Sequence, residues 1–198
     1  MRRLGVLGIC LLLLFTGCLK DDDETVLLPI PASKILGIDL PEDFENHFHV
    51  NEGSNPPDVF GRFLATPMVV EYASDGYFNP EFYDLSFEFS HLYGRNTTMY
   101  GERQHSSSGR GTNAQVIGSG NDFTVFFYSE LQDQIEQWKC KTATIISGTL
   151  LSNGISNFQY ANIMIEKDDP LGKIMEVGQY HIFHDEDGFV EMNGGGAL

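Results

Sequence analysis

Hydrophobic and polar residues alternate most regularly along residues 83–90. Large apolar side chains occupy every second position of this segment, at Tyr83, Leu85, Phe87 and Phe89. A period of two places them on one face of a strand. The segment therefore predicts a β-strand with one buried face and one face in water.

Short apolar segments continue to residue 192, separated by glycine and polar clusters. None is long enough to predict a long amphipathic helix. The other predicted strands are residues 60–72 with a bend at Pro67, 97–105, 115–117, 123–128, 142–151, 158–166, 178–185 and 189–192. Residues 106–111 are serine and glycine apart from Arg110, and they predict a mobile loop.

Two glycine-bearing segments predict hairpin turns. Gly118-Ser119-Gly120-Asn121-Asp122 separates two apolar segments, and so does Glu186-Asp187-Gly188. An Asp-Gly pair between apolar strands is typical of a type I′ turn, because both central positions need a positive φ.

Residues 129–139 predict one short helix. Ser129 and Gln132 fit a capping box, and Leu131, Ile135 and Trp138 share a helix face at i, i+4 and i+7.

These elements predict an all-β fold, an antiparallel β-sandwich or a closed barrel of about eight strands. Periodicity does not distinguish the two. The β domain is predicted over residues 55–198, since prolines interrupt residues 25–58, which we interpret as a tether and lead-in.

The N-terminus has the pattern of a secretory signal peptide. Arg2 and Arg3 precede an apolar run over residues 4–15. As a helix this run would reach about 18 Å, short of the roughly 30 Å of a hydrocarbon core. A basic start, a short apolar middle and a small-residue cut site describe a signal peptide.

The cut site, Phe15-Thr16-Gly17-Cys18, resembles the lipobox of bacterial lipoprotein precursors, although leucine is most common where Phe15 stands. The resemblance implies that residues 1–17 are the signal peptide and that residues 18–54 begin with a lipidated cysteine. Acyl chains such as palmitate on Cys18 would anchor the chain to a membrane at about 0.8 kcal/mol per buried methylene.

Lysine and acidic residues over 20–24 follow Cys18 directly. This stretch is similar to the surface-export signal of some Gram-negative lipoproteins, and it equally fits an ordinary acidic linker.

Charge and cysteine content narrow the functional classes. Without Arg2 and Arg3, ten of the twelve basic residues remain against 28 acidic residues, a formal net charge of −18. Nucleic acid is therefore not an expected partner. Cys10 would leave with the signal and Cys18 would be acylated, so Cys140 has no partner for an intrachain disulfide. The core must hold the fold, with Cys140 as a small buried hydrophobe.

Polar clusters give few candidates for chemistry. Asp185 and Asp187 precede Gly188, as carboxylates do in calcium loops, but the full spacing is missing and a hairpin turn also explains them. His47 and His49 would share a face of an extended segment, without a third zinc ligand nearby. His105 and Ser106 allow a hydrolase only nominally, because no G-x-S-x-G elbow is present.

Aromatic residues near predicted turns are the candidates for ligand binding. They are Tyr77, Phe78, Tyr93 and Tyr100. An aromatic ring with a polar tip can stack on a sugar or an apolar ligand, and core packing is the alternative role for each.

Three segments together look like uncharacterised Gram-negative surface lipoproteins with a compact β domain. They are 118–125, 146–155 and 185–189, and the resemblance would cover residues 55–192. It implies an all-β domain and no activity.

We therefore predict a lipoprotein held in the outer membrane through acyl chains on Cys18, with its domain on the cell surface or, alternatively, on the periplasmic face. The predicted function is non-enzymatic binding of a glycan, an apolar ligand or a protein, without a cofactor. The alternatives are a small extracytoplasmic hydrolase and a structural subunit of a surface assembly.

Overall fold

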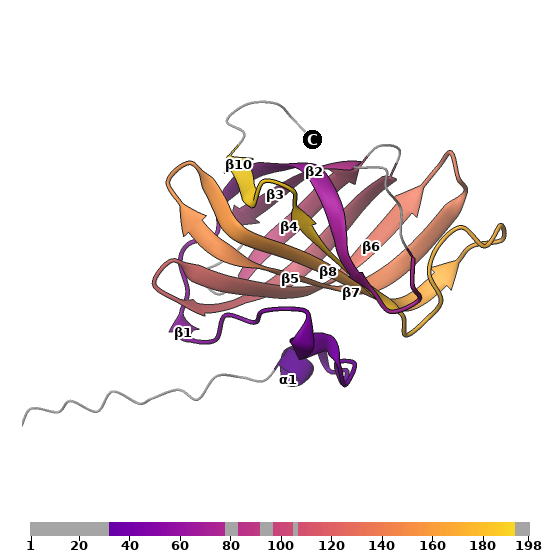
Figure 1. Cartoon of the computed structure of the whole chain (residues 1–198), viewed down its shortest axis with the longest axis horizontal. Coiled ribbons are helices and arrows are strands. Elements are labelled where there is room, and N and C mark those ends of the chain that lie inside the picture. Colours follow the sequence, from indigo (N-terminus) through magenta and orange to yellow (C-terminus); the bar gives the residue numbers. More distant parts are fainter. Residues whose placement is uncertain (1–31, 78–82, 92–96, 105–106, 193–198) are drawn as a thin grey trace, which may run out of the picture.

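The described part of the chain is mostly β-strand with almost no helix, which confirms the predicted all-β class (Figure 1). A computed structural model describes residues 32–77, 83–91, 97–104 and 107–192. Its strands are β1 (Ser54–Asn55), β2 (Gly61–Ala73), β3 (Tyr83–His91), β4 (Thr97–Gln104), β5 (Ser107–Ser119), β6 (Asp122–Asp133), β7 (Trp138–Leu151), β8 (Gly154–Asp168), β9 (Tyr180–Asp185) and β10 (Phe189–Met192). The short helices α1 (Ala32–Leu36) and η1 (Phe44–Asn46) precede them.

The strands form one sheet that closes on itself as a barrel. From β2 to β8, each strand pairs antiparallel with the next strand along the chain, including β5 with β6, so this part of the ring has no gap. β9 and β10 complete the ring between β8 and β2. β1 is the exception to the antiparallel pattern, because it pairs parallel with β5.

β9 and β10 do not form the hairpin that Glu186-Asp187-Gly188 predicts. Each pairs antiparallel with both β2 and β8, so they follow one another as two halves of a single interrupted strand. Gly188 does adopt a positive φ of 78°, and its N–H donates to the Asp185 carbonyl at 3.0 Å. The turn therefore bulges the strand and returns the chain to the same direction.

The predicted strand over residues 83–90 and the predicted bend of β2 are both confirmed. Leu85, Phe87 and Phe89 of β3 are buried, with relative exposures of 0–1%. The pairing of β2 with β3 shifts register between Ala65 and Met68, where Pro67 has no N–H to give to the ladder.

The helix predicted over residues 129–139 is wrong. Residues up to Asp133 continue β6, and Trp138 begins β7. The turn between them is closed by the Asp133 carboxylate, which accepts the N–H groups of Ile135 and Glu136 at 2.8 Å each. Ser129 is buried in the sheet, so it does not cap a helix. The short helices of the described residues, α1 and η1, both lie before the first strand.

The mobile loop predicted over residues 106–111 is also wrong, since Ser107 onward belongs to β5. Glycine serves packing here. A Cβ on Gly111 would lie 2.3 Å from a ring carbon of Phe127, so only glycine lets this buried ring lie across the strand.

Two hydrophobic clusters lie on opposite faces of the closed sheet. The first fills the barrel with side chains from β2, β3, β5, β6, β7, β8 and β10, among them Phe63, Phe87 and Phe123. The second covers the outer face of β6–β9 and is completed by Leu36, Phe44 and Phe48 from the N-terminal segment. In Figure 1 that segment runs along the outside of the barrel.

The packed unit therefore begins by Leu36, well before the predicted boundary at residue 55. Asp43 helps to hold the segment in place, because its carboxylate accepts the hydroxyls of Tyr180 at 2.7 Å and Tyr72 at 3.0 Å. These hydrogen bonds hold the pKa of Asp43 below its ordinary value.

Cys18, Phe78, Tyr93, His105 and Ser106 lie outside the described residues. Over the part of the chain that is described, no helix is both long enough and apolar enough to cross a membrane.

Candidate functional site

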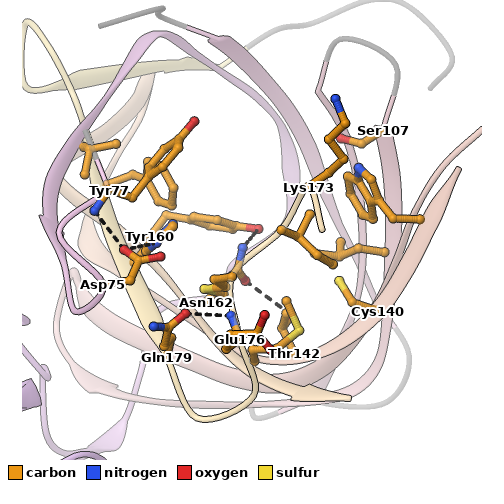
Figure 2. A pocket seen from close by; sticks show the side chains of 18 of the residues that line it. Asp75, Tyr77, Ser107, Cys140, Thr142, Tyr160, Asn162, Lys173, Glu176 and Gln179 are labelled. Atoms are coloured by element: carbon orange, nitrogen blue, oxygen red, sulfur yellow. Dashed lines mark hydrogen bonds and ion pairs between the residues drawn. The ribbon is translucent and has the colours of Figure 1, made fainter. Parts of the chain in front are cut away.

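One end of the barrel is packed and the other end contains a cavity of about 640 Å³ (Figure 2). Met68, Tyr160 and Phe183 belong to the boundary, because each packs with the inner cluster and also lines the cavity. The remaining lining comes from β2, β5, β6, β7, β8 and β9 and from the connections β2–β3 and β8–β9. The cavity therefore opens at the end of the barrel where these connections lie.

Nine of the twenty residues that line the cavity have apolar or sulfur-containing side chains. They are Met68, Val70, Leu131, Trp138, Cys140, Met164, Ile174, Met175 and Phe183. Thioethers and aromatic rings fill irregular space well, so such a wall suits an apolar ligand whose shape need not match it closely. Cys140 is half-buried in this wall, in contrast to the buried core position predicted for it.

The connection from β8 to β9, residues 169–179, forms part of the mouth and is held by its own hydrogen bonds. The Asp169 carboxylate accepts the Ile174 N–H at 2.9 Å, and the Lys167 ammonium contacts Glu176 at 2.8 Å. Backbone N–H groups of Lys173 and Ile174 lower the pKa of Asp169, so the carboxylate stays ionised and keeps the loop closed. Ile174 and Met175 are thereby placed against the cavity.

A second contact joins this loop to the turn between β6 and β7. The Lys173 ammonium lies 3.4 Å from the Glu136 carboxylate, and both side chains are about half exposed. An exposed pair of this kind contributes at most about 1 kcal/mol, so it can form and break without unfolding the barrel.

Charged groups of the cavity gather at its mouth and are paired there. His181 of β9 contacts the Asp75 carboxylate at 3.0 Å, and the Tyr77 N–H donates to the same oxygen at 2.9 Å. Burial raises the pKa of Asp75, whereas these hydrogen bonds and the charge interaction with His181 lower it, and the resulting pKa is below its ordinary value. Asp75 is therefore an ionised acceptor, and His181 Nε2 is the donor.

Tyr77 is the predicted ligand-binding residue that the structure brings to the cavity. Its ring is 47% exposed and stacks on His181 with centroids 5.2 Å apart. Tyr100 lies in β4. Sequence reasoning missed Asp75, Trp138, Asn162 and His181, because the residues around the cavity come from strands far apart in the chain.

The predicted metal candidates lie away from this cavity, in the bulge between β9 and β10. The buried Asp185 carboxylate accepts the Thr66 N–H at 2.7 Å and the Asp187 N–H at 3.2 Å. Burial and a hydrogen bond with the Asp187 side chain raise the pKa of Asp185. The Asp185 carboxylate thus accepts hydrogen bonds from two backbone N–H groups that have no partner in the strand ladder at the bulge.

Metal ligation has no further support among the residues that the structure covers, which contain no group of three or more histidine, cysteine or acidic side chains able to hold an ion. His47 stacks on Tyr72 with centroids 3.7 Å apart, and the His49 N–H donates to Gln159, so both belong to the packed N-terminal segment.

Comparisons of this chain with protein-family models, with curated proteins and with solved structures found no match.

Proposed function

We propose that this protein binds a small, largely apolar molecule inside the barrel, and that acyl chains on Cys18 hold it at the outer membrane, facing outward. One observation carries the binding proposal. The barrel is packed with aromatic side chains at one end, whereas about 640 Å³ is left open at the other.

The size and lining of the cavity support this proposal. Sites for small molecules are usually concave, about 300–1,000 Å³ in volume, and mostly apolar with a few polar groups. A barrel of eight strand positions is wide enough either to be filled by side chains or to hold one small ligand. In this chain the two possibilities are divided between the two ends of the barrel.

Trp138 provides a direct test, because it is the single tryptophan of the chain and it lines the cavity. The chain from Leu19 onward retains both hydrophobic clusters. We expect it to bind the neutral dye N-phenyl-1-naphthylamine in saturable fashion, with energy transfer from Trp138 to the dye. Absence of saturable transfer would refute the binding proposal.

A cavity-filling variant separates binding in the cavity from adsorption to the surface. Val70→Phe puts a ring into the cavity and should weaken dye binding by about tenfold or more, with little loss of thermal stability, since it fills empty space. Leu151→Phe is the matched control, because Leu151 is 38% exposed in the sheet at the β7–β8 turn and does not line the cavity. It should bind dye like the wild type.

The anchoring proposal rests on the sequence around Cys18 and has its own test. Cys18→Ala should abolish labelling by a fatty-acid analogue and release the protein from membranes. Unchanged labelling would contradict it. Protease treatment of intact cells would then distinguish the two orientations, because full protection would place the domain on the periplasmic face.

A further inference from the structure

A network of uncharged polar side chains lies inside the barrel beside the cavity. The hydroxyls of Ser129, Thr142 and Thr144 form a triangle with sides of 2.8, 2.7 and 2.9 Å. All three residues are buried, with relative exposures of 0–1%. Thr142 reaches the cavity, together with Asn162 and Tyr160 of β8 (Figure 2).

The amide oxygen of Asn162 faces this hydroxyl network. Thr144 donates to Asn162 Oδ1 at 2.8 Å, and Thr142 lies 3.4 Å from the same oxygen. The amide NH₂ group is thereby turned the other way, where one N–H donates to the Tyr160 hydroxyl at 2.9 Å. An asparagine has two N–H groups, and among the described residues the second has no hydrogen-bond partner.

The charge distribution around the cavity limits what this N–H can meet. The charged lining residues, Asp75, Lys173, Glu176 and His181, belong to the connections at the mouth or to the first residues of β9. Asn162 lies opposite His181 in the β8–β9 ladder, but the His181 ring already contacts the Asp75 carboxylate. The hydrogen-bond partners of the Asn162 side chain are uncharged hydroxyls. An ionised group brought among them would lose its hydration without a counter-ion, which costs several kcal/mol.

We infer that the bound molecule is uncharged and carries an oxygen acceptor, a carbonyl or a hydroxyl, that receives a hydrogen bond from the Asn162 amide, while its apolar part contacts the methionine and aromatic wall. This inference rests on the proposed binding function and names the ligand class of the same cavity. Asn162 is the specificity-determining residue.

Three probes of similar shape test it by displacement of N-phenyl-1-naphthylamine. They are 2-acetylnaphthalene, which has a neutral carbonyl, 2-ethylnaphthalene, which has no acceptor, and 2-naphthoate, which is charged. The wild type should bind the ketone at least about tenfold more tightly than the carboxylate. Carboxylate binding equal to that of the ketone would overturn the inference.

Variants at Asn162 test the hydrogen bond itself. Asn162→Leu should weaken binding of the ketone by roughly tenfold and leave binding of ethylnaphthalene nearly unchanged, since one hydrogen bond is lost. Asn162→Val is a second, smaller variant that also lacks the N–H donor and adds no charge, and it should show the same selective loss. Gln132→Leu is the control, an amide replaced on an exposed position of β6, and it should change neither probe.

Equal weakening of both probes by both variants would overturn the role of Asn162. The dye separates this result from failure of the proposed function. If the wild type binds the dye but shows no dependence on Asn162, only the ligand class is refuted, whereas absence of dye binding refutes the cavity as a binding site.

Discussion

Replacing Phe44 by alanine should destabilise the whole domain, although Phe44 precedes every strand. Its ring is fully buried, stacks on Phe48 with centroids 5.1 Å apart and packs on Tyr180 of β9 at 5.5 Å. A tether would tolerate the change without a measurable effect. If the N-terminal segment instead packs on the barrel, as it does in the structure, the change removes a large buried side chain and destabilises the domain.

The magnitude follows from the burial. Loss of a fully buried phenylalanine, with the cavity it leaves, costs about 3–5 kcal/mol. In a domain of about 160 residues each kcal/mol lowers the melting temperature by about 2–4 °C, so the expected decrease is roughly 6–20 °C. The expected decrease in the free energy of unfolding is large because the outer face of β6–β9 depends on this segment for its cover.

Urea unfolding followed by Trp138 fluorescence and by far-ultraviolet circular dichroism would measure the effect. Phe60→Ala is the matched control, since Phe60 is 54% exposed, and it should cost less than about 1 kcal/mol. A loss below about 1 kcal/mol for Phe44→Ala, equal to the control, would refute the conclusion that the N-terminal segment is part of the core.

Three further predictions concern charge and backbone geometry. Asp43 has a lowered pKa because the Tyr180 and Tyr72 hydroxyls donate to its carboxylate. Its ionised form therefore stabilises the fold at neutral pH, and this contribution is lost as the pH falls through the lowered pKa. The difference in urea midpoint between the wild type and Asp43→Asn should accordingly shrink between about pH 5 and pH 2. Asp185 uses its carboxylate for backbone N–H groups, so millimolar calcium or a chelator should leave the melting temperature unchanged, and an upward shift with calcium would restore the metal hypothesis. In chemical denaturation, Gly118→Ala should lower the free energy of unfolding more than Gly120→Ala, because a Cβ at Gly118 would lie 2.0 Å from a backbone oxygen. Gly120, at a φ of 66°, faces open space, so its replacement should lower the free energy of unfolding by about 1–2 kcal/mol. Equal decreases for the two variants would contradict this prediction.

Several strands follow from short-range pattern alone. In β3 the alternation of Leu85, Phe87 and Phe89 with polar residues can bury one face only as a strand, and the structure agrees. The hairpin between β5 and β6 was equally local, because Ser119 and Asp122 pair across a two-residue turn that contains Gly120.

Other segments carried a pattern that two structures satisfy. Residues 129–139 match a helix in their spacing, but Ser129 pairs with Thr142 across the β6–β7 ladder and joins the buried hydroxyl network. Glu186-Asp187-Gly188 predicts a hairpin, and the turn is present, but β2 and β8 offer partners on both sides, so the chain continues in line. Long-range pairing decided both cases.

The cavity residues show the same contrast between what local pattern predicts and what long-range pairing decides. Tyr77 was identified as a candidate because an aromatic residue near a predicted turn is visible in the sequence. Asp75 and His181, 106 positions apart, could not be paired by local reasoning, and neither could Thr144 and Asn162.

The order of polar and apolar residues determined that this chain would form short antiparallel strands, because period and turn chemistry act over a few residues. The tertiary structure decided that the sheet closes, that residues 35–50 cover its outer face, and that side chains fill one end of the barrel and leave the other open. Those outcomes depend on register and volume summed around the whole ring, to which every strand contributes and which no single segment contains.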